Sequence, residues 1–151
     1  MGTVAFERFL EARTSGESET EQLRHRNAGL AGYHKALELL PENAVNDLAV
    51  THNQLGAIHG DAGDIDRALS HYRKTIGFDE SAGNRYGAGQ TRFNVALALA
   101  DSGRLADARE YARAALRDFE PYGAGAAADV EKANRLIAEI EQRMAAPDAP
   151  P

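Results

Sequence analysis

The strongest constraint on this chain is an internal similarity between two segments that lie 40 positions apart. One segment is residues 52–69, HNQLGAIHGDAGDIDRAL, and the other is residues 92–109, RFNVALALADSGRLADAR. In this alignment Gly63 falls on Gly103, and further matches are Leu55 with Val95, Ala68 with Ala108, and Asp61 with Asp101. Self-similarity at a fixed period of this size is typical of helical repeat arrays, whose units stack to bury a continuous core.

The stretch HGDAGDIDRAL at residues 59–69 places three aspartates around two glycines, which suggests a calcium loop. Such a loop needs oxygen ligands at alternate positions and a glutamate near its end, and neither Asp61 nor Asp64 begins such a frame. The second copy also has Arg104 in place of Asp64. We therefore predict a turn between two helices. Gly63 would adopt a left-handed conformation at a helix end, and Asp64 would cap the next helix.

Apolar residues recur every three or four positions without an alternating strand pattern, which predicts an all-α fold. The expected helices cover about 3–13, 19–40, 43–63, 64–79, 84–102, 104–119 and 125–145. We expect antiparallel pairs at about 3–40, 43–79 and 84–119, with the helix at 125–145 as a C-terminal capping helix. Residues 1–146 would then form a single helical array, and residues 147–151 a disordered tail.

The composition argues against several functional classes. The net charge is −6 and no basic block is present, which argues against nucleic acid or an anionic membrane as partner. The chain has no cysteine, which excludes thiolate chemistry and cysteine-ligated zinc. The N-terminus does not have the pattern of a signal peptide, and the longest apolar run, VALALA, is too short to span a bilayer. We therefore expect a cytoplasmic protein.

Other residue patterns suggest chemistry but lack the required context. His52, His59 and His71 suggest a metal site, but the first two are seven positions apart, longer than the three to five typical of paired ligands. We interpret them as partly buried structural side chains. The stretches YGAGQTR and YGAGAAAD match part of a dinucleotide fingerprint but follow no strand. Gly87 and Gly89 are expected to allow close helix contact, and no cofactor, metal site or catalytic residue is predicted.

These residues resemble the tetratricopeptide repeat (TPR) family, a helix-turn-helix repeat with small and aromatic residues at fixed positions. The resemblance rests on Leu55-Gly56, His59, Gly63, Ala68, Tyr72 and Thr75, and on Val95-Ala96, Leu99, Gly103, Ala108, Ala112 and Ala115. His52 and Arg92 stand where the family often has Trp. The spacing of 40 exceeds the usual 34 and resembles the long repeats of bacterial regulatory proteins and kinesin light chains. The resemblance implies a right-handed α-solenoid of antiparallel helix pairs.

The resemblance also implies a peptide-binding groove lined by the first helix of each pair. Chaperone-binding members of the family clamp a carboxylate with Lys, Arg and Asn, whereas the ten equivalent positions here hold neither Lys nor Arg. A neutral or basic peptide or helix is therefore the expected partner, with amides for its backbone and Phe93 as an anchor. Alternatively, the amides are only solvated and Phe93 packs under a neighbouring helix. The predicted groove residues are Val50, Asn53, Gln54, Ala57, Asp61, Gln90, Phe93, Asn94, Leu97 and Asp101.

We therefore predict a non-catalytic scaffold that binds a protein or peptide through this groove. The alternative is a structural or self-association module of a larger bacterial regulatory protein, whose groove binds a second copy, as in a homodimer, or another domain of the same chain. Neither nucleic acid nor a membrane is expected as a partner. A stripe formed by Arg109, Arg113 and Arg117 is expected to be a solvated convex face, with an acidic partner as the alternative.

Overall fold

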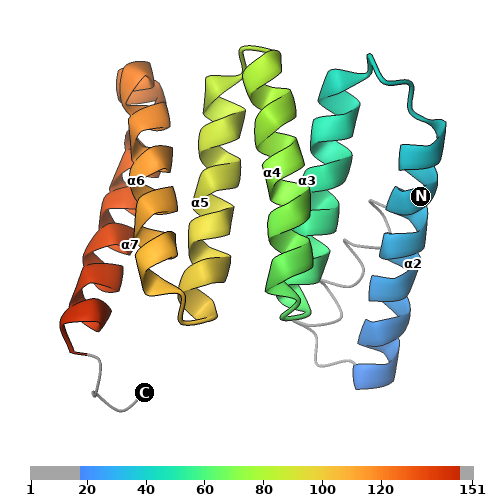
Figure 1. The fold of residues 1–151 in the computed structure, drawn as a ribbon, viewed down its shortest axis with the longest axis horizontal. Coiled ribbons are helices and arrows are strands. Elements are labelled where there is room, and N and C mark those ends of the chain that lie inside the picture. The colour runs from blue at the N-terminus through green and yellow to red at the C-terminus, as the bar shows by residue number, and fades with distance from the viewer. Residues whose placement is uncertain (1–17, 147–151) are drawn as a thin grey trace. The chain divides into compact units, whose positions relative to one another are not determined.

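The computed structural model describes residues 18–146, and their regular structure is helical (Figure 1). The elements are α2 (Glu19–Leu39), α3 (Val45–Asp61), α4 (Ile65–Ser81), α5 (Arg85–Asp101), α6 (Leu105–Phe119), the 3₁₀ helix η1 (Glu120–Ala126) and α7 (Ala127–Ala145). The helices predicted within this range are confirmed, with ends that differ by at most two residues. The helix predicted at 3–13 and the tail at 147–151 lie outside the described residues. Within residues 18–146, no helix is both long and apolar enough to cross a membrane.

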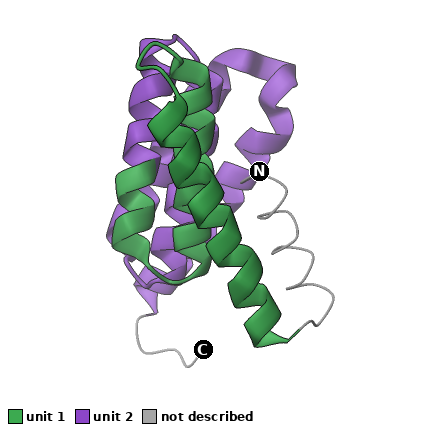
Figure 2. Ribbon diagram, turned by 90° about the vertical axis from the view of Figure 1, so that its right-hand side faces the viewer, with its two compact units in different colours: residues 1–71 green, residues 72–151 purple. Residues whose placement is uncertain are grey.

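The chain divides into two compact units, and the division falls inside α4, between His71 and Tyr72 (Figure 2). In the first unit, α2 packs against α3, which is followed by the beginning of α4. In the second unit, the remainder of α4 precedes α5, and α6 packs against both α5 and α7. These are the neighbouring helix contacts that an array of helical hairpins requires.

Three turns end their helices in the same way, around glycines spaced 20 residues apart. Gly63, Gly83 and Gly103 have φ of 77°, 70° and 80°, a left-handed conformation that only glycine adopts without a steric cost. In the first turn, the Gly63 N–H donates to the Gly60 carbonyl and the next N–H, of Asp64, donates to the His59 carbonyl. The same two hydrogen bonds recur at the other turns, so each is a Schellman closure that satisfies the last helical carbonyls.

The length of the helices explains the period. Each of α3, α4 and α5 has 17 residues, and a three-residue turn brings the half-repeat to 20. The predicted cap is confirmed, since the Asp64 carboxylate accepts a hydrogen bond from the Arg67 N–H at 3.3 Å. Asn84 has the same role for α5, where its side chain accepts from the Gly87 N–H at 3.1 Å. Arg104 at the third turn makes no such side-chain bond.

Small residues let the helices of the second unit approach closely. Ala108, Ala112 and Ala115 form a fully buried stripe on α6, as the predicted contact role of Ala108 requires. On α5, a Cβ built at Gly89 would lie 2.9 Å from both the Asp118 Cβ and the Phe119 ring. Phe119 is itself almost completely buried, so α5 and α6 contact each other here with no room for a side chain at position 89.

The first unit has a smaller core between α2 and α3. Tyr33 from α2 and Leu55 and Ile58 from α3 are its buried members. Half-buried apolar residues of the same helices surround them, namely Leu30, Leu37 and Ala57. Among the described residues, this cluster is where apolar side chains of α2 and α3 pack together.

The connection to α7 differs from the other turns. Gly123 continues the 20-residue spacing and has φ of 54°, but it lies inside η1 and not in a three-residue turn. The connection between α6 and α7 is thus a kink within a 3₁₀ segment. The outer face of α7 carries an ion pair between Glu131 and Arg135, whose side chains are about 70% exposed. A charged outer face of this kind is what the end of a repeat stack requires in water.

Two glycine substitutions test the close contact between α5 and α6. Gly89→Ala should lower the free energy of unfolding by roughly 1–3 kcal/mol, because the new methyl group overpacks against Asp118 and Phe119. Gly77→Ala in α4 meets no atom within 4 Å and should raise it by about 0.5–1 kcal/mol through helix propensity. Urea unfolding followed by far-UV circular dichroism measures both. Equal effects of the two substitutions would contradict the contact.

Candidate functional site

The predicted groove residues of the first unit lie on one side of α3. Val50 is 60% exposed. Asn53, Gln54 and Ala57 are half-buried, and Asp61 is exposed at the end of the helix. Among the described residues, the Asn53 Oδ1 atom is buried and has no hydrogen-bond partner. This side of α3 thus combines an exposed apolar side chain with amides and an acid.

The predicted groove residues of the second unit lie on α5. Leu97 is 39% exposed, and Gln90 and Asp101 are also exposed, whereas Asn94 is half-buried. Phe93 is half-buried and packs against the apolar cluster formed by Ala115, Phe119, Ala126 and Ala133. Its ring therefore contributes to the packing between α5, α6 and α7.

Helix α7 continues the same surface, a feature that the sequence reasoning missed. The offset of 40 that relates α3 to α5 also places Val130, Asn134 and Ile137 at the positions of Gln90, Asn94 and Leu97. Val130 and Ile137 are half-buried and Asn134 is exposed. A direct contact links the two helices, since Arg143 donates to the Ala100 carbonyl at 2.9 Å. Treating residues 125–145 only as a capping helix hid this third copy, although the offset alone could have revealed it.

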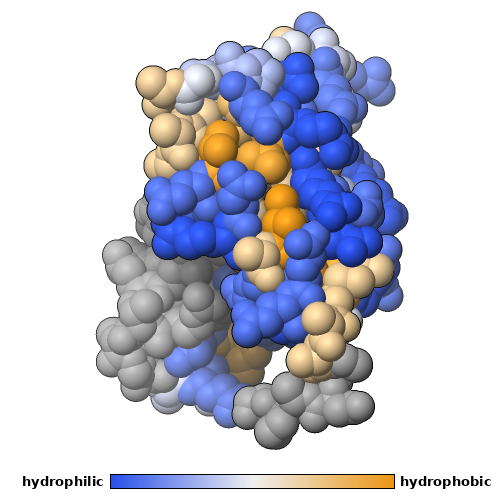
Figure 3. Space-filling view, turned by 90° about the vertical axis from the view of Figure 1, so that its left-hand side faces the viewer, coloured by the Kyte–Doolittle hydropathy of each residue, from blue (hydrophilic) through white to orange (hydrophobic). Residues whose placement is uncertain are grey.

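The end of the second unit that carries α6 and α7 has an apolar strip between hydrophilic margins (Figure 3). The half-buried apolar side chains of these two helices include Leu116, Val130, Ile137 and Met144. Three of them, Val130, Ile137 and Met144, are seven residues apart along α7 and therefore share one side of the helix. The side chains of α7 thus present a continuous apolar line rather than scattered single residues.

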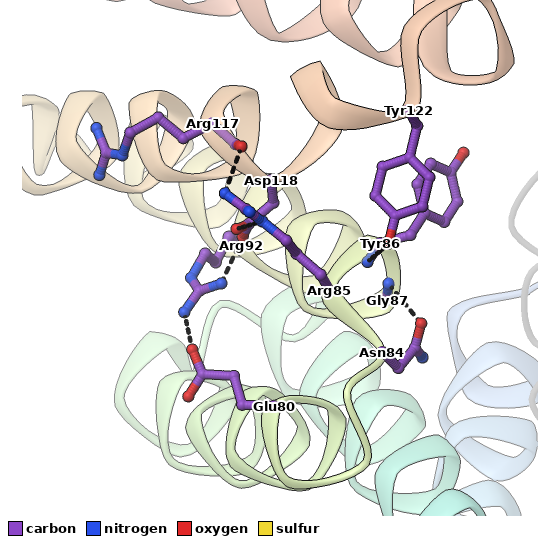
Figure 4. A network of polar contacts seen from close by, with 9 residues as sticks. All are labelled: Glu80, Asn84, Arg85, Tyr86, Gly87, Arg92, Arg117, Asp118 and Tyr122. Carbon is purple, nitrogen blue, oxygen red and sulfur yellow. Dashed lines mark hydrogen bonds and ion pairs between the residues drawn. The ribbon is translucent and has the colours of Figure 1, made fainter.

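An ionic network fixes α5 between its neighbours. The Arg92 guanidinium bonds both to Glu80 in α4 and to Asp118 in α6, and only 19% of the Arg92 side chain is exposed (Figure 4). Arg85 also reaches Asp118, with Nε at 3.2 Å from Oδ1, and donates to the Arg117 carbonyl at 2.9 Å. Arg92 stands where the family often has Trp. A partly buried, charge-assisted bridge thus stands in place of an aromatic contact at this position.

The electrostatics of these groups follow from their partners. Burial alone would lower the pKa of Arg92, but the hydrogen bonds to Glu80 and Asp118 outweigh it and raise this pKa above its ordinary value. The phenol of Tyr86 donates to Asp129, and this hydrogen bond raises the Tyr86 pKa. Burial raises the pKa of Asp79, although a hydrogen bond from Asn84 opposes the change. These interactions join neighbouring elements of the second unit.

The histidines considered for a metal site lie together in the first unit. His52 is buried, and its Nδ1 lies 2.9 Å from that of His71, while the His59 ring stacks on His71. In the part of the chain that the structure describes, no group of His, Cys, Asp or Glu is arranged to hold a metal ion. Of the glycines compared with a dinucleotide fingerprint, Gly87 and Gly89 lie inside α5 and follow no strand. Gly89 has the predicted role of allowing close helix contact.

The arginine stripe of α6 is partly engaged within the second unit. Arg113 donates to Glu141 of α7 at 2.8 Å and lies 3.7 Å from Glu110. Arg109 is half-buried, with its Nε 3.7 Å from a Glu110 oxygen. The stripe is thus less solvated than expected, because α7 covers part of it.

Comparison with known families agrees with this architecture. The family model "Tetratricopeptide repeat" matches residues 47–120, which run from the first turn of α3 to the end of α6. The chain belongs to the tetratricopeptide repeat family. Repeats of this family generally mediate protein–protein interaction as non-catalytic scaffolds, and they bind proteins or peptides. Neither a curated protein nor a solved structure matches the chain.

The network around Arg92 makes a specific prediction about stability. Arg92→Met should lower the free energy of unfolding by roughly 2–4 kcal/mol, because it leaves the nearly buried Asp118 carboxylate with Arg85 alone. Arg135→Met is the matched control, since it removes an exposed ion pair on α7 and should change stability by less than about 0.5 kcal/mol. Denaturant unfolding measures the free energy of unfolding of both variants. Similar losses of stability in the two variants would show that the network around Arg92 does not stabilise the fold.

Proposed function

We propose that the chain is a protein-binding scaffold that recognises a neutral or basic peptide or helix through the surface formed by α5 and α7. The observation that carries this proposal is the exposed Leu97 beside a half-buried amide, Asn94, on a helix of a repeat fold. Exposure of an apolar side chain to water is unfavourable, so its burial by a partner contributes favourably to binding. The neighbouring amide can bond a peptide backbone that lies across it.

The chemistry of this surface favours one class of ligand. The ten positions on α5 and α7 related by the offset of 40 include two acids, Asp101 and Glu141, and no base. Glu141 forms an ion pair with Arg113. Among the described residues, Asp101 forms no such ion pair. An exposed carboxylate such as that of Asp101 attracts a positive group and repels an acidic tail. The surface therefore suits a ligand with apolar side chains and a neutral or positive charge.

Phe93 has a supporting role in this proposal. Its ring packs against the cluster that includes Ala133 and Phe119, so it fills space between α5 and α7. A ligand would then contact Leu97, Val130 and Ile137, which remain partly exposed. Phe93 would act by holding these side chains in place rather than by inserting into the partner.

The first unit offers a similar surface on α3. Val50 takes the place of the exposed apolar residue, and Asn53 and Gln54 supply the amides. The buried Asn53 oxygen without a partner is a group that a backbone N–H donor could satisfy after a small side-chain rotation. We include these residues in the proposed recognition surface of that unit.

A selection experiment tests the proposal without a known partner. Peptides selected by phage display against the intact chain should be neutral or basic and rich in apolar residues. Their affinity for the Asn94→Ala/Leu97→Ala variant should fall roughly tenfold or more, because a hydrogen bond and an apolar contact are lost together. Fluorescence polarisation with labelled peptides gives the dissociation constants.

The matched control is Arg135→Ala, on the side of α7 away from Ile137, which should leave these constants unchanged. Undiminished affinity of the α5 variant would reject this surface as the binding site. Light scattering over a range of concentrations tests the alternative of self-association. A dimer that the α5 substitutions dissociate would show that the surface binds a second copy of the chain.

A further inference from the structure

Four of the five histidines of the chain form one cluster in the first unit. His71 in α4 is its centre, and its ring centroid lies 5.2 Å from that of His52 and 5.5 Å from that of His59, both in α3. The planes of His59 and His71 are only 4° apart, so these rings stack. His34 in α2 completes the cluster, with its ring edge toward His71 at a centroid distance of 6.4 Å. The cluster therefore connects all three helices of this unit.

The contact between His52 and His71 depends on protonation. Their Nδ1 atoms lie 2.9 Å apart, the distance of a hydrogen bond in which one nitrogen donates and the other accepts. A neutral imidazole has one nitrogen of each kind, whereas an imidazolium has only donors. Two neutral rings, or one neutral and one charged ring, can make this bond. Two charged rings cannot, and they repel each other.

Burial and most of the charges that face His59 oppose a positive imidazole at this ring. Burial lowers the pKa of His59; Asp64 in the turn raises it, and Arg67 in α4 together with His34 and Arg26 in α2 lowers it further. The charged neighbours of His59 are thus one carboxylate, that of Asp64, and the guanidinium groups of two arginines. Both α2 groups near His59 are positive once His34 is protonated, so acid adds repulsion between α2 and α3.

We propose that this cluster makes the docking of α2 onto α3 and α4 sensitive to acid. The ordinary histidine pKa is about 6.5, and two imidazole rings in contact pack without repulsion only while at most one of them carries a proton. As the pH falls below that value, the undocked state takes up protons that the docked state resists, so docking weakens. Release of α2 would expose the side chains of Tyr33, Leu55 and Ile58, which form the buried cluster between α2 and α3.

The second unit supplies an internal reference. Forty positions after the four histidines stand Lys74, Arg92, Leu99 and Tyr111, so the equivalent places hold no group that titrates near neutral pH. The same comparison provides a conservative variant. His59→Leu and His71→Tyr together introduce the residues that the next repeat uses at these positions.

Hydrogen exchange of the intact chain, measured by mass spectrometry in the presence of EDTA, tests the proposal. Protection factors corrected for intrinsic exchange are compared at about pH 7.5 and about pH 5.5, with dilute protein because the isoelectric point is near 5.3. The amides of α2 should lose protection when the pH is lowered. The expected loss is up to about tenfold for each imidazole that stays neutral while α2 is docked but has its ordinary pKa once α2 is released. The amides of α6 should lose little.

Two variants complete the test. His59→Leu/His71→Tyr should remove the pH dependence of α2, whereas His25→Gln should keep it, since His25 lies nine residues before His34 on α2, roughly 13 Å along the helix. Equal pH dependence of α2 and α6 in the wild type would overturn the proposal, even if the double variant failed to fold. A double variant that folds and keeps the wild-type dependence of α2 would overturn it as well.

Discussion

The left-handed glycine that closes each of α3, α4 and α5 is the constraint on which the remaining contacts depend. At Gly63, Gly83 and Gly103 the same pair of backbone hydrogen bonds ends one helix and turns the chain into the next. A residue with a Cβ would pay a steric cost in this conformation, so the turn and the glycine are linked. Because the turns recur at a fixed spacing, side chains on successive helices meet in register. The fit of Gly89 against Phe119 is one result of this register.

Features set by local sequence were the ones that could be predicted. The helices followed from apolar periodicity, and the turn at Gly63 and the cap at Asp64 followed from residues within a few positions of each other. Gly83 occupies the same kind of turn, but a comparison at an offset of 40 pairs Gly63 with Gly103 and does not relate Gly83 to either of them. The ten residues predicted to line a groove lie on α3 and α5, but their contact with a partner stays a prediction, because it depends on the partner as well as on this chain.

Interactions between distant residues could not be predicted from the sequence. Arg92 was recognised only as a departure from an aromatic position, since its partners lie 12 and 26 residues away and meet it only after folding. The histidine cluster has the same origin, because His52 and His71 are separated by 19 residues and belong to different helices. The two units thus carry different chemistry at equivalent places. One joins its helices through imidazoles, and the other joins them through an arginine between two carboxylates.

The equal spacing of the glycine turns also has a consequence for how such a chain changes in length. A block of 40 residues that begins and ends at these glycines contains one complete helical hairpin, and its two boundaries have the same backbone geometry. Gene duplication or deletion of that block would join one glycine turn to another of the same geometry. The residues at the new junction would therefore not need to change. The kinked 3₁₀ segment around Gly123 lacks this geometry, and it therefore marks the place where in-frame copying of hairpins would stop being neutral.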